Sequence, residues 1–283
     1  MIVLESDRAR LELDPAFGAR VTALWDKRAG REWLVTGPRE GEAGEDAAYG
    51  AREARGWDEC FPTVTPCRHP AWGDLRDHGL LWGRPWVTVA HGATARSTYR
   101  DPRFAFSRVL GLSEGTVTAL YEVENRGAEA LPWMWSQHCL LAPRPGERLR
   151  LDGFWGFEAG GEGFRWPERE GRDLSVVGGP EEGFALKAYA RAAGAVSAAV
   201  EGEAGGIRLA WEEGQVPALG LWIDWGGWPD DPRLGAPVHQ LAIEPTSAPC
   251  DGLDEAEALG AVRWLAPGES AFWRMTITLT DPA

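Results

Sequence analysis

Lysine, cysteine and long apolar runs are scarce in this 283-residue chain, and basic residues are outnumbered by acidic ones. Each of these features except the lysine shortage argues against a class of site or partner. Lys27 and Lys187 are the only lysines, a bias that is typical of a GC-rich genome and says little about mechanism. No apolar stretch approaches the roughly 20 residues that a transmembrane helix needs, and residues 1–8 lack the long apolar core of a signal peptide. We therefore expect a cytoplasmic protein with no membrane partner.

The four cysteines include no Cys-x-x-Cys pair, so the sequence spells out neither a zinc knuckle nor a redox motif. We expect reduced thiols that serve as small core residues. Cys139 directly follows His138, but neighbouring residues of a strand point to opposite faces. We therefore do not expect Cys139 to act as a nucleophile.

The charge balance is strongly negative, with a formal net charge of −14 and a pI near 4.9. Binding of a phosphate backbone needs a positive face, and the summed field of this chain is repulsive, so we expect no nucleic-acid partner. Anionic membrane surfaces are disfavoured for the same reason. The sequence leaves open whether the protein is a monomer or a homodimer.

Short runs of alternating polar and apolar residues dominate the chain, and each is bounded by Gly, Pro, Asn or Asp. A period of two puts the apolar side chains on one face, which is typical of half-buried strands. The clearest of these runs are 10–13, 20–25, 116–123, 207–211 and 272–279. We predict an all-β fold, a large antiparallel β-sandwich. We expect residues 1–283 to form a single domain, because all-β sandwiches often reach this length as one unit.

Three other segments are harder to assign. Residues 184–200 are rich in alanine and fit a helix, but Gly194 interrupts them and their alternation fits strands as well. Residues 37–55 and 159–183 are predicted to be long exposed loops, and loops of that length in a compact domain are often mobile or functional.

His138 follows closely on two tryptophans, in a chain with 16 tryptophans and only 4 tyrosines. An isolated histidine on an apolar strand is often a hydrogen-bonded core residue, and that alternative stays open. We nevertheless expect Trp133 and Trp135 on the same face as the imidazole. Aromatic faces pack against the C–H side of a pyranose while a polar group addresses its oxygens, so this setting favours a sugar pocket.

Glu244 ends an apolar run at 241–243 and precedes Pro245. A buried carboxylate without a partner is costly, and burial raises its pKa towards the range of a general base. The alternative is a partly exposed glutamate at a strand end, hydrogen-bonded to Thr246 or Ser247. An imidazole and a carboxylate that face each other across a cleft suit proton transfer on a hydroxylated substrate, since one accepts a proton while the other donates.

A third candidate, His78, begins a stretch dense in Gly, Pro and Trp, which is typical of a pocket-lining loop. The segment around Asp58 and Glu59 has a similar composition, and these acids would bind hydroxyls, bind a cation or be solvated. A metal site made by His78, His138 and Glu244 is chemically reasonable. We rank it lower and expect no metal, because no two of the three have the spacing of metal ligands.

The candidate residues also occur in the order of a known family. In sequence order the set is Arg55-Gly56, Phe61-Pro62, His78-Gly79, Arg84, Trp86, His138, Glu244-Pro245-Thr246, and Pro267-Gly268-Glu269 before Trp273. Over essentially the whole chain this set resembles the galactose mutarotase-like (aldose 1-epimerase) superfamily, with some features of its hexose-6-phosphate epimerase branch. One departure is that Gln137-His138-Cys139-Leu140-Leu141 replaces the Asn-His-x-Tyr-Phe-Asn-Leu run of galactose mutarotases.

The resemblance implies an active site on a concave sheet face, and interconversion of the α and β anomers of an aldose without a cofactor. It implies Glu244 as the catalytic base, His138 as the catalytic acid and His78 as the histidine that binds and polarises the sugar. The residues expected to contact the sugar are Arg55, Arg84, Asp58, Glu59, Trp135 and Trp228. Acids at 58 and 59 would repel a phosphate, and whether C6 carries hydroxyl, carboxylate or phosphate stays open.

The chemistry of a hemiacetal leads to the same mechanism. Ring opening removes the proton of the anomeric hydroxyl while the ring oxygen is protonated, and a carboxylate facing an imidazolium does both. The rate would then rise as Glu244 ionises and fall as His138 loses its proton. Two alternatives stay open: a non-catalytic carbohydrate-binding protein on the same scaffold, and a carbohydrate lyase or metal-assisted sugar isomerase that uses His78 and His138.

Overall fold

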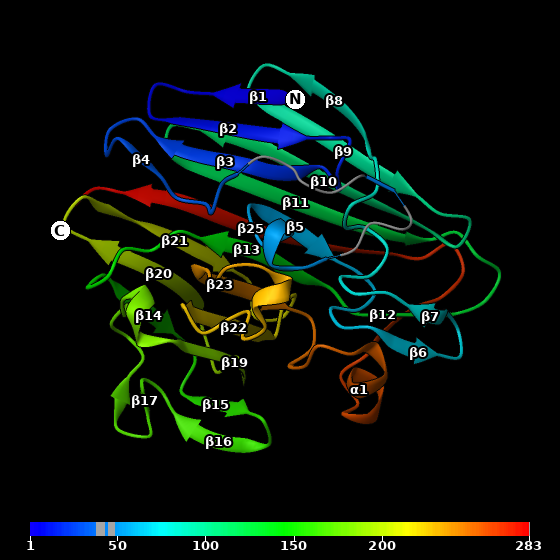
Figure 1. Cartoon of the computed structure of the whole chain (residues 1–283). Coiled ribbons are helices and arrows are strands. Elements are labelled where there is room, and N and C mark those ends of the chain that lie inside the picture. The colour runs from blue at the N-terminus through cyan, green and yellow to red at the C-terminus, as the bar shows by residue number, and fades with distance from the viewer. Residues whose placement is uncertain (38–42, 45–48, 283) are drawn as a thin grey trace.

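The strands of the chain form two large antiparallel sheets (Figure 1). The structure is a computed structural model that describes residues 1–37, 43–44 and 49–282. In sheet order, the larger sheet contains β1 (Ile2–Glu5), β2 (Ala9–Asp14), β3 (Arg20–Asp26), β5 (Trp57–Cys60), β13 (Ser136–Leu141), β23 (His239–Thr246), β22 (Ala218–Trp225), β19 (Phe184–Arg191), β15 (Gly156–Ala159), β16 (Glu162–Arg165), β17 (Glu168–Arg169) and β18 (Arg172–Asp173), with β4 (Arg31–Glu32) paired to β3.

The smaller sheet contains β14 (Arg148–Asp152), β20 (Val196–Gly202), β21 (Gly205–Trp211), β25 (Ser270–Thr280), β11 (Thr116–Asn125), β10 (Phe104–Ser113), β9 (Thr94–Arg100) and β8 (Val87–His91). Two further strand pairs are β12 (Leu131–Trp133) with β24 (Arg263–Leu265), and β6 (Cys67–His69) with β7 (Gly73–Leu75). The helical segments are α1 (Leu253–Ala258) and the short 3₁₀ turns η1 (Ala51–Glu53), η2 (Pro180–Glu182) and η3 (Pro232–Leu234).

Apolar side chains that alternate along the strands hold the two sheets together. In β11, and over most of β25, every second residue is buried, as expected for strands with one face on a core. Leu11 and Val21 of the larger sheet belong to the same buried cluster as Phe106 and Ile277 of the smaller one. The predicted antiparallel β-sandwich is confirmed, and each of the five clearest predicted runs lies in a strand.

The central strands β13 and β23 differ from this pattern, because both of their faces are buried. One face packs on the core between the sheets. The other is covered by side chains from loops, among them His78 and Tyr49, whose rings contact His138. This second face is the one on which the candidate catalytic residues of the two strands lie.

Two of the three segments that were hard to assign from the sequence contain strands. Residues 184–200 contribute to β19 and β20, because cross-strand packing outweighs the helix propensity of their alanines. The segment 159–183, predicted to be a loop, is mostly exposed but contains β16, β17, β18 and η2. Of the predicted loop 37–55, residues 38–42 and 45–48 lie outside the described residues, and η1 follows them.

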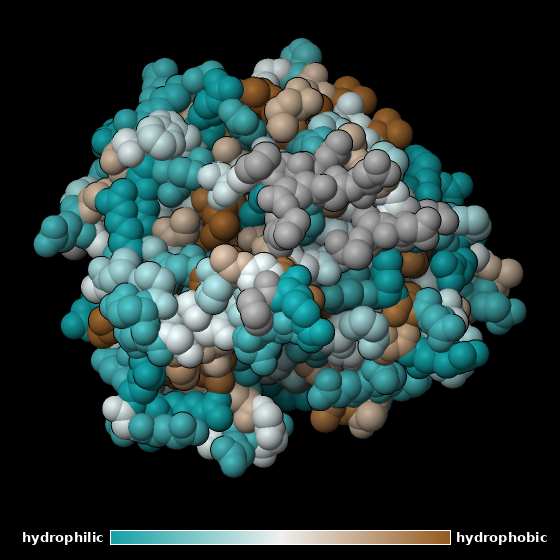
Figure 2. All heavy atoms as spheres, viewed as in Figure 1, coloured by the Kyte–Doolittle hydropathy of each residue, from teal (hydrophilic) through white to brown (hydrophobic). Residues whose placement is uncertain are grey.

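The surface and the thiols agree with the composition. The side of the molecule seen in Figure 2 is mainly hydrophilic, with hydrophobic side chains in small separate areas. All four cysteines are free, and all except Cys67 are buried. Within the described ranges, no helix has both the length and the apolar character needed to cross a bilayer.

Candidate functional site

The neighbouring strands β5, β13 and β23 bring three predicted residues into one row across the larger sheet. Asp58 of β5 pairs with His138 of β13. On the other side, the register of β13 against β23 sets His138 opposite Glu244. Directly opposed residues of antiparallel strands share a face, and their Cβ atoms are about 4.5–5.5 Å apart. The imidazole and the carboxylate predicted to transfer protons are therefore immediate neighbours.

The row continues through β22 and β19, where Gly220 lies opposite Glu244 and Tyr189 lies opposite Gly220. A Cβ atom at Gly220 would lie 2.9 Å from the Tyr189 ring and 3.0 Å from Glu244 Oε2. Glycine at this position therefore lets the tyrosine ring and the carboxylate approach each other above the sheet.

His78 reaches the row from the loop that follows β7. Its φ is 60°, in the left-handed region that few residues with a side chain adopt. Its backbone N–H donates to the Val64 carbonyl at 2.6 Å. The next residue has to be glycine, because a Cβ atom at Gly79 would lie 2.2 Å from the Phe61 carbonyl oxygen. These contacts hold the backbone of the loop in place and so fix the direction of the imidazole.

Aromatic rings gather around the two histidines. The ring centroids of His78 and His138 are 4.7 Å apart, with the planes at 76°. Tyr49 stacks on His78 at 3.6 Å between centroids and meets the His138 ring edge-on at 5.7 Å. Trp82 lies 6.1 Å from His78. The structure thus brings the two predicted histidines together and adds Tyr49, which no pattern in the sequence marks.

Three polar atoms of this cluster are buried without a hydrogen-bond partner among the described residues: His78 Nε2, His138 Nδ1 and Glu244 Oε1. Leaving such an atom unpaired costs on the order of 1–3 kcal/mol of stability, so each of the three is available for a hydrogen bond with water or with a ligand hydroxyl. His78 Nδ1 lies 3.0 Å from Asp77 Oδ1. Because an ionised carboxylate only accepts hydrogen bonds, Nδ1 carries the proton, and Nε2 of the neutral ring can accept one from a hydroxyl.

Burial shifts the two proton-transfer candidates in opposite directions, because it disfavours whichever form is charged. It raises the pKa of Glu244 above its ordinary range, although the ammonium of Lys187 opposes this. Burial lowers the pKa of His138 well below its ordinary range, and the positive charges of Lys187 and Arg20, and of His78 when its ring is protonated, act in the same direction. His138 is therefore neutral at neutral pH, and the imidazolium that the sequence suggested is not its resting form.

Lys187 of β19 belongs to the cluster although no motif identified it. Its Nζ donates to Glu244 Oε2 at 2.5 Å and lies 3.6 Å from Asp251 Oδ1. The Glu244 side chain is 1% exposed, so the pair is buried on the carboxylate side. One signal was available in the sequence, because Lys27 is the only other lysine.

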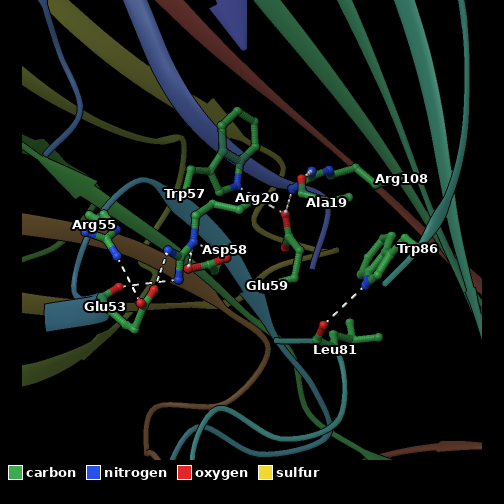
Figure 3. A network of polar contacts seen from close by, with 10 residues as sticks. All are labelled: Ala19, Arg20, Glu53, Arg55, Trp57, Asp58, Glu59, Leu81, Trp86 and Arg108. Atoms are coloured by element: carbon green, nitrogen blue, oxygen red, sulfur yellow. Dashed lines mark hydrogen bonds and ion pairs between the residues drawn. The ribbon is translucent and has the colours of Figure 1, made fainter. Parts of the chain in front are cut away.

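On the other side of His138, Asp58 belongs to a buried network of ion pairs (Figure 3). Arg20 Nε lies 3.0 Å from Asp58 Oδ2, and Arg20 Nη1 lies 3.0 Å from Glu53 Oε2. Arg55 Nη2 lies 2.9 Å from Glu53 Oε1. Arg55 and Arg20 also line a cavity of about 340 Å³. Of the two predicted sugar contacts in this network, Asp58 lies in the row itself and Arg55 is connected to it through two other charged residues.

Glu59 faces away from the row, which corrects its predicted sugar contact. It follows Asp58 along β5, so its side chain points to the opposite face, into the space between the sheets. There it is fully buried and accepts a hydrogen bond at 2.7 Å from Arg108 of β10 (Figure 3). Tyr121 and Trp135 also donate to it. Glu59 therefore joins the two sheets.

Trp135 and Trp133 lie in the same core, so the expectation of indoles beside His138 is also corrected. Trp135 precedes β13, donates to Glu59 at 2.7 Å and packs 5.0 Å from the Trp273 ring. Trp133 stacks on Trp273 at 5.6 Å. Trp135 and Trp133 precede His138 by odd numbers of positions, three and five, which puts them on the opposite face of an extended chain.

The last two predicted contacts, Trp228 and Arg84, lie in different places. Trp228 is half-buried, 6.0 Å from the ring of Trp222, and packs on a small apolar cluster that includes Leu140. Leu140 is two residues beyond His138 on the same face, so Trp228 borders the row. Arg84 Nη1 donates to the hydroxyl of Tyr99 at 2.6 Å, which directs this guanidinium towards β9 of the smaller sheet.

The chemistry available at this row is proton transfer between oxygen atoms. Glu244 offers a carboxylate oxygen, His138 an imidazole and His78 a hydrogen-bond acceptor, next to the apolar rings of Tyr49 and Trp228. Across residues 1–37, 43–44 and 49–282, no group of three His, Cys, Asp or Glu side chains is arranged to hold a metal ion.

The fold is that of the galactose mutarotase-like proteins. The chain matches a candidate aldose 1-epimerase from Escherichia coli K12 with a TM-score of 0.74 and 20% identity, over 99% of this chain and 98% of that one. Galactose mutarotase-like proteins from Lactobacillus casei (TM-score 0.69, 14% identity, 99% of each chain) and Clostridium acetobutylicum (TM-score 0.71, 15% identity, 99% and 94%) match similarly. No family model matches the chain, and no curated protein matches it significantly. Similarity to the hexose-6-phosphate epimerase branch stays a prediction.

Proposed function

We propose that this protein is an aldose 1-epimerase-like isomerase that interconverts the α and β anomers of a free aldose. The observation that carries the proposal is the placement of His138 and Glu244 opposite each other on neighbouring strands, each with a buried polar atom to which no described residue forms a hydrogen bond. A fold shared with a candidate aldose 1-epimerase and with galactose mutarotase-like proteins supports the same conclusion.

In this proposal Glu244 Oε1 takes the proton of the anomeric hydroxyl. The O–H electron pair forms the C1 carbonyl, the bond from C1 to the ring oxygen breaks, and that oxygen takes on the negative charge while His138 donates a hydrogen bond to it. Rotation about the C1–C2 bond presents the other face of the carbonyl. The ring oxygen then attacks that face, Glu244 returns its proton to the oxygen on C1, and the ring closes as the opposite anomer. Only protons move, so the reaction consumes no cofactor.

His138 begins this cycle as a neutral imidazole, because burial lowers its pKa. A neutral imidazole can still act as an electrophile in a buried site, since its N–H stabilises the negative charge that develops on the departing oxygen. His78 accepts a hydrogen bond from a second sugar hydroxyl through Nε2, while Asp77 holds its other nitrogen. The two histidines thus have separate tasks, one at the reacting atoms and one in orienting the ring.

The test is to dissolve a pure anomer and follow its conversion by NMR at equal concentrations of each variant. We expect Glu244→Gln to lower the catalysed rate by roughly 10²–10⁴-fold, the usual cost of losing a general base, because an amide keeps the shape but accepts no proton. The matched control is Glu203→Gln, at an exposed loop position, which should leave the rate unchanged.

Neutral aldoses, hexuronates and hexose 6-phosphates should be screened in parallel, so that the substituent at C6 is identified by rate. A folded Glu244→Gln protein as active as the wild type would rule out the base. A wild-type protein that binds an aldose without accelerating its anomer exchange would favour the carbohydrate-binding alternative.

A further inference from the structure

A polar cluster of four residues lies beside the proposed catalytic pair. Lys187 Nζ contacts Glu244 Oε2 at 2.5 Å and approaches Asp251 Oδ1 at 3.6 Å. The hydroxyl of Tyr189 donates to the same Asp251 oxygen. Lys187 Nζ also lies 5.2 Å from the centroid of the Tyr189 ring. Lys187 is therefore held from two sides while it contacts the carboxylate.

The cluster opens onto a cavity of about 270 Å³ lined by Lys187, Tyr189, Asp251, Glu158 and Glu255, among other residues. The Lys187 side chain is 24% exposed, whereas that of Glu244 is 1% exposed. The lysine is thus the member of the pair that remains in contact with solvent. The carboxylate of Glu244 therefore bears most of the free-energy cost of removing the pair from water, and its attraction to the ammonium of Lys187 offsets part of that cost.

The two oxygens of Glu244 have unequal surroundings. Oε2 is bound by the ammonium of Lys187, and the close approach of Glu244 and Tyr189 over Gly220 restricts it further. Oε1 is buried without a partner among the described residues. A carboxylate fixed through one oxygen presents the other in a defined direction, as a general base requires.

We propose that Lys187 is a positioning residue of the isomerase: it holds Oε2 of Glu244, keeps the carboxylate ionised and so presents Oε1 to the anomeric hydroxyl. This inference rests on the proposed function. Lys187 itself keeps its proton, because Glu244 and Asp251 raise its pKa despite burial. It therefore acts as a fixed positive charge.

Several other titratable groups face Glu244 from the surrounding elements. They are Tyr189 of β19, His138 of β13, Cys60 of β5, Asp251 after β23 and His78 after β7. Asp251 opposes ionisation of Glu244, whereas Lys187 favours it, as does His78 when its ring is protonated. Within the described part of the chain, Lys187 is the group among these that contacts a Glu244 oxygen, and it has the largest effect that opposes burial.

The decisive comparison is between Lys187→Met and Lys187→Arg. We expect Lys187→Met to move the acid limb of the kcat/KM profile up by about one to three pH units, which is the usual effect of removing an opposite charge at this distance. Lys187→Arg keeps the charge and should keep the limb near that of the wild type. Lys27→Met is the matched control, because Lys27 lies at the surface beside Glu5.

A merely structural role would lower activity in both Lys187 variants without moving the limb, and that result would overturn the proposal. If Lys187→Met does not fold, lysine-labelled protein provides a second measurement. Since the chain has only two lysines, NMR should show two side-chain signals. The Lys187 signal should shift in Glu244→Gln while the Lys27 signal stays fixed. A Lys187 signal that does not respond would equally contradict the contact.

Failure of the proposed function can be told apart from failure of this inference. The titration of the Glu244 carboxyl is followed by carbon NMR in glutamate-labelled protein, with the signal assigned by its absence in Glu244→Gln. If no aldose is converted but this titration moves in Lys187→Met, the reaction is wrong and the positioning contact holds. If aldoses are converted and the titration does not move, only the role of Lys187 is wrong.

Discussion

At the scale of single residues, burial acts on the two groups proposed to transfer protons with opposite results. Burial favours the protonated carboxyl of Glu244 and the neutral imidazole of His138. Without a compensating charge, the base would be protonated over a wider range of pH. The ammonium of Lys187 supplies that compensation for Glu244. The positive groups near His138 act in the same direction as burial and keep its ring neutral.

This arrangement predicts a pH profile that differs from the bell expected from the sequence. We expect kcat/KM for anomer exchange to rise with pH as Glu244 ionises and then to stay level through pH 7. The raised pKa of Glu244 keeps the base protonated, and the rate low, to a higher pH than usual. The lowered pKa of His138 means that its ring is already neutral near its ordinary pKa of about 6.5, so no loss of rate follows there.

The profile should be measured by NMR exchange rates with the uncatalysed rate subtracted at each pH. A fall in rate above neutral pH that disappears in His138→Gln would show that the imidazolium is the active form. Proton NMR of the histidine ring is an independent check, since the His138 signals should not titrate near neutral pH.

At the scale of the elements, β5 serves the row on one face and the core on the other. Asp58 lies beside His138, while the next residue, Glu59, joins the two sheets through Arg108. The period-two pattern predicts such alternation. The pattern does not predict which residue faces the row and which faces the core, because that depends on strand pairing. The composition around these two acids suggested a pocket loop, whereas the segment is a fully buried strand.

The core role of Glu59 can be tested directly. Its carboxylate and the Arg108 guanidinium are both fully buried, 2.7 Å apart. We expect Glu59→Gln to lower the free energy of unfolding by about 3–5 kcal/mol, because it leaves a buried guanidinium without its counter-ion. Anomer exchange per folded molecule should be little changed, since this side chain faces away from the row. Urea titration gives the first quantity and the exchange assay gives the second.

The matched control is Glu122→Gln, whose partner Arg96 lies 3.4 Å away at the surface with a side chain that is 57% exposed. An exposed pair of this kind contributes about 0–1 kcal/mol, so the variant should unfold close to the wild type. A Glu59→Gln protein that is as stable as the wild type but has lost activity would contradict the core role and support the sugar contact predicted from the sequence.

At the scale of the whole molecule, the fold was predictable from the sequence because it follows from a local signal. Alternating runs such as 116–123 and 272–279 identify strands without any knowledge of their partners. Residue type and context also identified His78, His138 and Glu244, which the structure brings into one cluster. Strand order and register join segments about a hundred residues apart, as for His138 and Glu244, and no local pattern encodes them. Lys187 and Tyr49 were therefore not among the predicted site residues, since it is the fold that brings them into the cluster.

If residues 1–283 form a single domain, as the sequence predicts, the two sheets should unfold together. Side chains of both sheets belong to one buried cluster, so neither sheet keeps its apolar face covered when the other is lost. Glu59 and Arg108 add a fully buried ion pair between them. We expect one cooperative transition in urea, with tryptophan fluorescence and far-ultraviolet circular dichroism giving the same midpoint. Indoles such as Trp57 and Trp273 lie on different sheets, so fluorescence reports on both. Two separated midpoints, or a proteolytic fragment that unfolds cooperatively by itself, would instead divide the chain into independent units.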